Sequence, residues 1–239
     1  MTTSLFISDL HLDPGRPQGI QLFDDFICQK AQAADQLFIL GDLFEYWLGD
    51  DASRHCGYQS IAESLATLSS HDTKVYLMHG NRDFLLGEAF CRATGARLLP
   101  DPSVISLCGI PTLLMHGDSL CTADIDYQAF RRTSRDPAWQ RDVLGRSLQQ
   151  RRDLASQLRQ MSKAANSNKA EDIMDVTPTE VRDKLREYQV RQLIHGHTHR
   201  PARHEHPDGV RWVLGDWDRD GWVLEVTSEG ISLNKFPII

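Results

Sequence analysis

Short apolar runs recur along the first part of the chain, and each ends in a cluster of Gly, Asp, Asn or His. Runs of this length, closed by turn-forming residues, predict buried β-strands. Between them, residues 20–34 and 60–69 have the spacing and composition of helices. Strands that alternate with helices predict an α/β sheet that is covered on both faces. The predicted strands are residues 4–8, 36–40, 74–78, 113–115 and 192–194.

The C-terminal part of the chain has a different pattern. Residues 210–214, 222–226 and 231–233 are short runs rich in Val, Trp, Leu and Ile. Segments that contain glycine separate these runs and can form turns. The pattern therefore predicts three successive antiparallel strands.

Residues 124–186 interrupt the strand pattern, because they contain many helix formers and no strand-like run. Apolar side chains recur there at helical spacing, as at Leu154 and Leu158. We therefore expect a helical insertion over this segment, on a core built from residues 1–123 and 187–239.

The composition is that of an ordinary globular protein. Hydrophobic residues make up 41% of the 239 positions and charged residues 25%, which excludes a disordered or collagen-like chain. The net charge of −7 argues against a nucleic-acid coat protein. The chain shows no signal-peptide pattern, and no apolar stretch approaches the roughly 20 residues of a membrane span. Five cysteines without a CxxC pair favour free thiols in a reducing cytosol.

Five polar clusters follow predicted strands. Ligands bind open α/β sheets at the carboxyl ends of the strands, so all five clusters can converge on one crevice. Carboxylate, imidazole and amide donors together favour Mn²⁺, Fe²⁺ or Zn²⁺, whereas an all-oxygen set would favour Mg²⁺ or Ca²⁺. The clusters are Asp9-Leu10-His11, Gly41-Asp42, Gly80-Asn81-Arg82-Asp83, His116-Gly117-Asp118 and His195-Gly196-His197.

In this order the clusters form the motifs DxH, GD, GNxD, HGD and GHTH, and the set resembles the calcineurin-type metallophosphoesterase superfamily. The resemblance implies a β-sandwich of two mixed sheets flanked by helices, and two metal ions that share one bridging carboxylate. Such a metal pair, about 3.5–4 Å apart, lowers the pKa of a shared water for in-line attack on phosphorus. The implied ligands are Asp9, His11, Asp42 and His197 for one metal, and Asp42, Asn81, His116 and His195 for the other.

Two further histidines flank the motifs. We expect His79 and His199 either to hold a neighbouring metal ligand in place or simply to pack, rather than to bind a metal. His204 and His206 fall in a predicted surface strand or loop.

Arg82 departs from the superfamily pattern, because many members have at this position a histidine that can protonate the leaving group. Arginine does not release its proton at neutral pH, but its guanidinium binds phosphate oxygens through two parallel hydrogen bonds. Such a site suits a leaving group that needs little protonation, such as a phosphate released from a pyrophosphate. The alternative is a plain salt bridge between Arg82 and Asp83.

A narrower resemblance is to the UDP-2,3-diacylglucosamine diphosphatases of lipid A synthesis in Gram-negative bacteria. Residues 80–85, 114–121 and 215–217 carry it, and residues 43–50 and the helical insertion fit it. It implies a lipid-linked nucleotide as substrate, UMP and 2,3-diacylglucosamine 1-phosphate as products, and two Mn²⁺ per chain. The implied catalytic residues are Asp42, Asn81, Arg82, His116 and His195, and the implied substrate contacts are Asn81, Arg82, Asp124, Ser162, Asn166, Lys169 and His195.

The predicted insertion is basic although the whole chain is acidic. Residues 127–169 contain ten basic and three acidic residues, a local charge of +7, so the rest of the chain carries −14. Basic residues interleaved with apolar ones are typical of helices that lie on a membrane surface. We expect a monomer without a nucleic-acid partner, peripheral on the cytoplasmic face of the inner membrane, whose apolar cap residues take acyl chains. The alternative is that these residues only pack on the core and leave the arginines solvated.

Two other functions fit the sequence. A nucleotide or nucleic-acid phosphodiesterase of the same superfamily would hold a phosphate backbone on the basic segment, which offers few aromatic side chains for base stacking. A scaffold with this fold but without turnover would typically lack metal ligands, whereas all seven positions are filled here.

Overall fold

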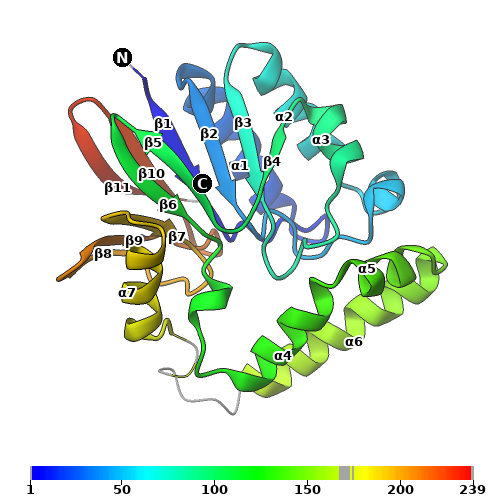
Figure 1. The fold of residues 1–239 in the computed structure, drawn as a ribbon. Coiled ribbons are helices and arrows are strands. Elements are labelled where there is room, and N and C mark those ends of the chain that lie inside the picture. The colour runs from blue at the N-terminus through cyan, green and yellow to red at the C-terminus, as the bar shows by residue number, and fades with distance from the viewer. Residues whose placement is uncertain (1, 167–172, 174, 238–239) are drawn as a thin grey trace.

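Two β-sheets packed face to face form the body of the protein in the computed structural model, which describes residues 2–166, 173 and 175–237 (Figure 1). The first sheet has the strand order β11-β10-β1-β2-β3-β4, and the second has the order β5-β6-β7-β9-β8. The strands of the first sheet are β1 (Ser4–Ile7), β2 (Gln36–Leu40), β3 (Lys74–Met78), β4 (Arg97–Leu99), β10 (Asp220–Thr227) and β11 (Gly230–Pro237). Those of the second are β5 (Ser103–Leu107), β6 (Ile110–Leu114), β7 (Gln192–His195), β8 (Ala202–His206) and β9 (Gly209–Val213).

Both sheets are mixed. In the first, β1 to β4 run parallel, and β10 lies antiparallel to β1 with Val226 opposite Ser4. In the second, β7 pairs in parallel with β6 and β9, while β5 and β8 are antiparallel edge strands. The expected sandwich of two mixed sheets is therefore confirmed.

Three helices in the first half of the chain cover the outer face of the first sheet, and the last helix covers that of the second. The helices are α1 (Pro17–Gln29), α2 (Gln59–Ser70), α3 (Glu88–Thr94), α4 (Ile125–Ser134), α5 (Pro137–Leu144), α6 (Leu148–Asn166) and α7 (Pro178–Glu187). Short 3₁₀ turns are η1 (Ala31–Ala33), η2 (Asp50–His55) and η3 (Asp118–Leu120).

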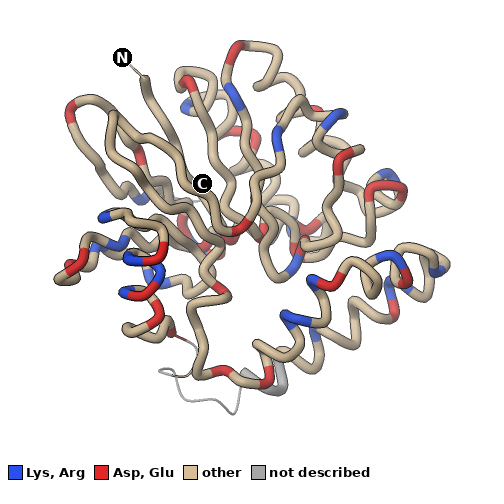
Figure 2. Tube along the Cα trace, in the orientation of Figure 1, with Lys and Arg blue, Asp and Glu red and all other residues tan. Residues whose placement is uncertain are grey.

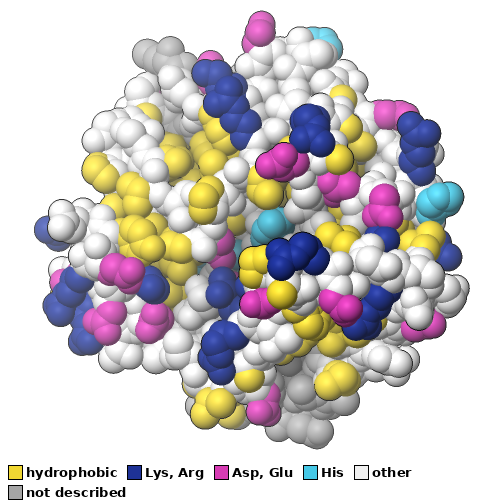
Figure 3. Space-filling model, turned by 45° about the vertical axis from the view of Figure 1, so that its right-hand side comes forward, with side chains coloured by type: hydrophobic (Ala, Val, Ile, Leu, Met, Phe, Trp, Pro, Cys, Tyr) yellow, Lys and Arg dark blue, Asp and Glu magenta, His cyan; other side chains and the backbone are white. Residues whose placement is uncertain are grey.

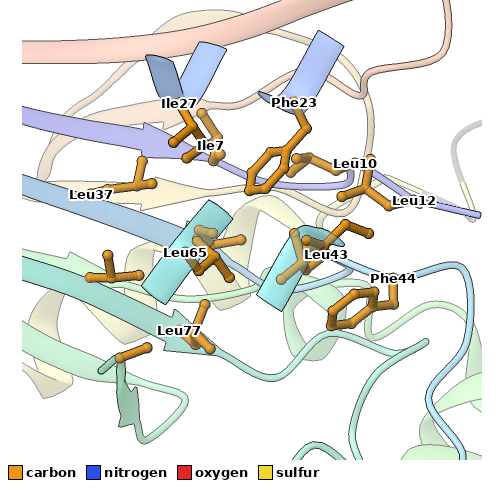
Figure 4. Packing of buried hydrophobic residues seen from close by; sticks show 14 of the residues in the cluster. Ile7, Leu10, Leu12, Phe23, Ile27, Leu37, Leu43, Phe44, Leu65 and Leu77 are labelled. Carbon is orange, nitrogen blue, oxygen red and sulfur yellow. The ribbon is translucent and has the colours of Figure 1, made fainter. Parts of the chain in front are cut away.

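Three apolar layers hold the body together. Helix α1 begins at Pro17, whose fixed φ suits the first helical turn, and buries Phe23 and Ile27 against the first sheet (Figure 4). A second layer, which includes Phe6 and Phe38, fills the space between the sheets. Burial of one such side chain contributes about 1.5–3 kcal/mol. The third layer lies between the second sheet and α7 and includes Val181.

Helices α4, α5 and α6 form a cap that stands apart from the sheets (Figure 1), and its basic residues are spread along all three helices (Figure 2). The turn between α4 and α5 is fixed locally, because the Asp136 carboxylate accepts hydrogen bonds from the N–H groups of Ala138 and Trp139. The predicted insertion extended to residue 186 and so included α7. Because α7 packs on the second sheet, it lies with the core rather than with the cap.

Every strand predicted from the sequence is present, but one predicted pairing is wrong. Strands β9 and β10 are not neighbours, because β9 belongs to the second sheet and β10 to the first. The segment between them crosses from one sheet to the other, and the Trp217 N–H donates to the Asp9 carbonyl on the way. The sequence pattern did not indicate β4, β5 and α3, whose apolar patterns are short, and for the residues of β8 it left strand and loop open.

Candidate active site

The candidate site lies at the carboxyl ends of five strands from both sheets. The loops that follow β1 and β2 continue the parallel pairing of their strands, because the backbone N–H of Asp9 donates to the Gly41 carbonyl (3.1 Å) and that of His11 donates to the Asp42 carbonyl (3.0 Å). This pairing brings the DxH and GD motifs side by side. The second sheet adds the loops after β6 and β7, which the Gly196 N–H joins by donating to the His116 carbonyl (2.8 Å).

Asp42 is at the centre of the site and is almost fully buried. Its Oδ2 atom lies 3.8 Å from the Nε2 atoms of both His11 and His116. Asp9, Asp42 and His116 each present a ligand atom within 4.8 Å of the others. A second such group consists of Asp9, His11 and His199. Asp9 belongs to both groups, so the two clusters are contiguous.

The backbone is strained where these side chains converge. Five residues other than glycine have positive φ angles there: Asp9 (56°), His11 (47°), Asp42 (53°), His197 (67°) and His199 (54°). Such conformations cost about 1–3 kcal/mol each and tend to cluster at functional sites, where the surrounding structure holds them. The strain is therefore concentrated on residues of the site itself.

Two glycines of the motifs allow this close approach. A Cβ atom on Gly41 would lie 2.5 Å from the His116 Nδ1 atom, and one on Gly80 would collide with the Asp42 carboxylate. These contacts give a physical reason for the glycine in both the GD and the GN motif.

Asn81 lies between two histidines. Its Oδ1 atom is 3.0 Å from His116 Nε2 and 2.9 Å from His197 Nδ1. His195 is oriented differently, because its Nε2 atom lies 3.2 Å from Arg211 and its Nδ1 atom lies 2.8 Å from the Gly196 carbonyl. Of the seven predicted ligands, Asp9, His11, Asp42 and His116 fall in the two groups of carboxylate and imidazole ligands.

Electrostatics keep two of the predicted ligands neutral. Burial and the charge of Arg211 lower the pKa of His195 to about 3, and burial and His116 lower the pKa of His197 to about 4. Neutral imidazole is the form that binds metals. Burial raises the pKa of Asp42 above its ordinary value, because its charge lacks solvent.

His199 lies closer to the ligands than expected for packing alone. Its Nε2 atom is 3.3 Å from Asp9 Oδ1, and its Nδ1 atom is 3.5 Å from Asp216. Glu45 is a residue of the site that the motifs did not indicate, and its carboxylate lies 3.3 Å from His11 Nδ1. Its position three residues after Asp42 was the only feature of the sequence that pointed to a place in the site. His79 instead contacts the Leu86 carbonyl (2.6 Å).

Asp83 organises the backbone around the site and does not serve as the salt-bridge partner considered for Arg82. Its carboxylate accepts hydrogen bonds from the N–H groups of Gly80 and Leu43, both at 2.8 Å. The Arg82 N–H donates to Asp42 Oδ1 (2.8 Å), and its side-chain Nε is buried without a hydrogen-bond partner. This orphaned donor is available to an anionic ligand.

A cavity of about 400 Å³ lies between the cap and the core. Trp47, Phe84 and other apolar side chains from both parts line it, and Asn81 and Arg82 connect it to the polar site. The predicted substrate contacts Asp124 and Ser162 also line this cavity. The side chain of Asn166 and the whole of Lys169, predicted contacts as well, are outside the described residues.

Several basic residues of the cap bind the core. Arg131 donates to the buried Asp118 (2.9 Å), which also accepts from the Tyr127 hydroxyl (2.5 Å). Arg135 donates to the Gly80 carbonyl (2.9 Å), and Arg151 donates to the Leu48 carbonyl (2.7 Å). These arginines are therefore neither a solvated face nor a membrane surface, and they tie the cap to the loops that carry the ligands.

The residues fit a divalent metal centre. A divalent cation would neutralise the buried carboxylates of Asp9 and Asp42, whose charge is costly when unpaired. The mixed oxygen and nitrogen donors suit Mn²⁺, Fe²⁺ or Zn²⁺. Asp9, Asp42 and His116 supply such donors within reach of one another.

Comparison with known proteins agrees with this chemistry. A family model of calcineurin-like phosphoesterases matches residues 2–201. A UDP-2,3-diacylglucosamine hydrolase of Pseudomonas aeruginosa is 52% identical over 98% of this chain and 99% of its own length. The hydrolase of the same name from Marinobacter nauticus is 50% identical over 99% of this chain and 98% of its own length.

Among solved structures, an archaeal phosphodiesterase has a TM-score of 0.51 and 11% identity over 98% of this chain and 100% of its own, a similarity of fold alone. The family match and the full-length relatives show that this chain belongs to the calcineurin-like phosphoesterase family, and it therefore depends on divalent metal ions.

Proposed function

We propose that this protein hydrolyses the pyrophosphate bond of UDP-2,3-diacylglucosamine to UMP and 2,3-diacylglucosamine 1-phosphate in lipid A biosynthesis. The observation that carries the proposal is the junction of the apolar cavity with the polar site at Asn81 and Arg82. A lipid that is linked to a nucleotide through a pyrophosphate needs an apolar region for its acyl chains, next to a region that binds the anionic pyrophosphate. The full-length similarity to hydrolases named for this substrate supports the same assignment.

We propose two Mn²⁺ per chain, with Asp42 as the ligand common to both. Asp9, His11 and His197 would complete one set, and Asn81, His116 and His195 the other. When bound, such a pair supplies an activated water and neutralises negative charge in the transition state. His195 would have to leave Arg211 to take part, and its low pKa keeps the ring neutral for this role.

Arg82 is suited to bind the pyrophosphate. Its backbone N–H is fixed on Asp42, which holds the residue beside the centre of the site. Its buried Nε lacks a partner, and its side chain lines the cavity. A guanidinium can bind two phosphate oxygens at once and stabilise the charge that develops there. A phosphate leaving group requires little protonation, so an arginine can replace the histidine of other family members.

The cap would take the acyl chains. The side chains of Phe130, Leu154 and Leu158 line the cavity with apolar surface from α4 and α6. Asp124 and Ser162 stand in the same lining and can bind the polar groups of the glucosamine. We extend this role to Asn166 and Lys169 as a proposal from the family resemblance alone.

We also propose that the protein acts peripherally at the inner membrane, on its cytoplasmic face and as a monomer. None of the helices among the described residues is long and apolar enough to cross a bilayer. Ile125 and Met161, at the cap, are 75% and 68% exposed and offer apolar side chains for contact with lipid. Figure 3 shows basic and acidic side chains interspersed with apolar ones across one face of the molecule.

Release of UMP from UDP-2,3-diacylglucosamine by the purified protein tests the proposal. The same preparation should be given bis-p-nitrophenyl phosphate and DNA, the substrates of the alternative phosphodiesterase. We expect UMP release to exceed hydrolysis of both other substrates by orders of magnitude. A protein that cleaved DNA or the diester more readily would refute the assignment.

A further inference from the structure

A second cavity adjoins the first and differs from it in chemistry. It has a volume of about 280 Å³, and its lining combines the proposed metal ligands Asp9 and His11 with Arg16, Asp216 and Asp218. Of the described residues, Glu45 and Arg82 line both cavities. The two cavities therefore meet at the proposed pyrophosphate position beside Arg82.

The second cavity suits a neutral ligand that is rich in hydrogen bonds. Its polar and charged lining, which includes Arg16, Asp216 and Asp218, disfavours acyl chains. A nucleoside has the complementary groups, since its ribose hydroxyls and the N–H of uracil donate hydrogen bonds. Carboxylates bind ribose hydroxyls in this way in dinucleotide-binding folds.

Arg16 and Asp218 form a prepared pair at the rim of this cavity. Arg16 Nη2 donates to the His11 carbonyl (2.7 Å), which fixes the guanidinium beside a proposed metal ligand. Arg16 Nη1 donates to Asp218 Oδ1 at 3.3 Å. These contacts use two of the five N–H groups of the guanidinium, so the others can donate to the carbonyl oxygens of uracil. The Asp218 side chain is 66% exposed and presents its carboxylate to the cavity opening.

We infer that the part of this cavity lined by Arg16, Asp216 and Asp218 binds the nucleoside of the substrate, with an Asp218 carboxylate oxygen accepting a hydrogen bond from a ribose hydroxyl. The inference rests on the proposed function and adds the direction in which the substrate lies. The diacylglucosamine occupies the apolar cavity, the pyrophosphate lies at Arg82, and the uridine occupies the second cavity.

The test measures binding of the two products to the Mn²⁺-loaded protein by calorimetry. UMP is compared with its 2′,3′-dideoxy analogue, which lacks both ribose hydroxyls. We expect the wild-type protein to bind UMP about 10-fold more tightly than the analogue, as for the loss of a hydrogen bond to a charged group. In Asp218→Ala the affinity for UMP should fall about 10-fold, and UMP and the analogue should bind equally.

Two control variants separate this effect from general damage. Asp208→Ala also removes an aspartate that pairs with an arginine, but at the β8–β9 turn, at the end of β9 opposite His195, and should leave UMP binding within about twofold of wild type. Leu158→Ala, in the apolar cavity, should weaken binding of 2,3-diacylglucosamine 1-phosphate and leave UMP binding unchanged.

The inference is overturned if Asp218→Ala keeps the wild-type preference for UMP over the dideoxy analogue. It is also overturned if Asp218→Ala weakens the lipid product as much as UMP. Either result can occur in an enzyme that releases UMP normally, so failure of this inference is distinguishable from failure of the proposed function.

Discussion

The contact between Arg131 and Asp118 links the cap to the core beside a predicted metal ligand. Asp118 is fully buried and follows the predicted ligand His116 by two residues, while Arg131 lies on α4. The arginine donates to Asp118 (2.9 Å) and to Asp101 (3.2 Å), and Asp101 in turn accepts from the His116 N–H (3.3 Å). Arg131→Ala removes both ion pairs and leaves two carboxylates facing each other.

The expected loss of stability can be bounded from this geometry. Removal of one partner of a buried ion pair costs about 3–5 kcal/mol. The Arg131 side chain is 22% exposed, and Tyr127 and Arg135 remain beside Asp118, so water and these groups offset part of the cost. We therefore expect the free energy of unfolding to fall by about 2–3 kcal/mol. For a chain of this length that corresponds to a decrease in Tm of about 4–12 °C.

Thermal unfolding of the metal-free protein, followed by circular dichroism, measures this effect. The matched control is Arg186→Ala, which breaks the pair with Asp208 in which the Arg186 side chain is 61% exposed. Exposed pairs contribute about 0–1 kcal/mol, so its Tm should stay within about 4 °C of wild type. If Arg131→Ala lowered Tm no more than Arg186→Ala, the network would not anchor the cap.

Three further substitutions test the site. Asp42→Ala removes the carboxylate proposed to bind both metals. Elemental analysis should find less than half of the wild-type Mn²⁺, and UMP release should be close to background. Turnover near that of the wild type would disprove a shared ligand. Arg82→Lys keeps the charge but loses the paired N–H groups, so kcat should fall about 10²-fold, as for the loss of one transition-state donor, and a change in KM alone would indicate simple binding. Gly80→Ala places a Cβ atom against the Asp42 carboxylate, and should weaken Mn²⁺ binding in a titration, whereas unchanged affinity would show that the loop can move aside.

The sequence predicted the fold where local patterns are strong. The runs that became β1, β2 and β3 are apolar and end in ligand clusters, so periodicity and motif agree there. It failed where pairing depends on distant contacts, because β9 and β10 are close in the chain but lie in different sheets. Edge strands such as β4 and β8 carry mixed side chains that no alternation distinguishes from loop.

The candidate site shows the same division. Motif order was enough to gather Asp9, Asp42 and His116 in one place. Local sequence contained nothing to show that His195 contacts Arg211, because the two residues lie on neighbouring strands and meet only through the register of β7 and β9. The role of Arg131 was likewise hidden, since a count of charges cannot tell a solvated arginine from one that reaches a buried aspartate.

The metal requirement of UMP release provides the most direct test of the proposed chemistry. Protein treated with EDTA and freed of the chelator should release no UMP from UDP-2,3-diacylglucosamine, and addition of Mn²⁺ should restore the wild-type rate. Asp42→Ala, treated in the same way, should stay inactive at every Mn²⁺ concentration. UMP release by the metal-free protein, or recovery of Asp42→Ala with Mn²⁺, would contradict hydrolysis at a metal centre built on Asp42.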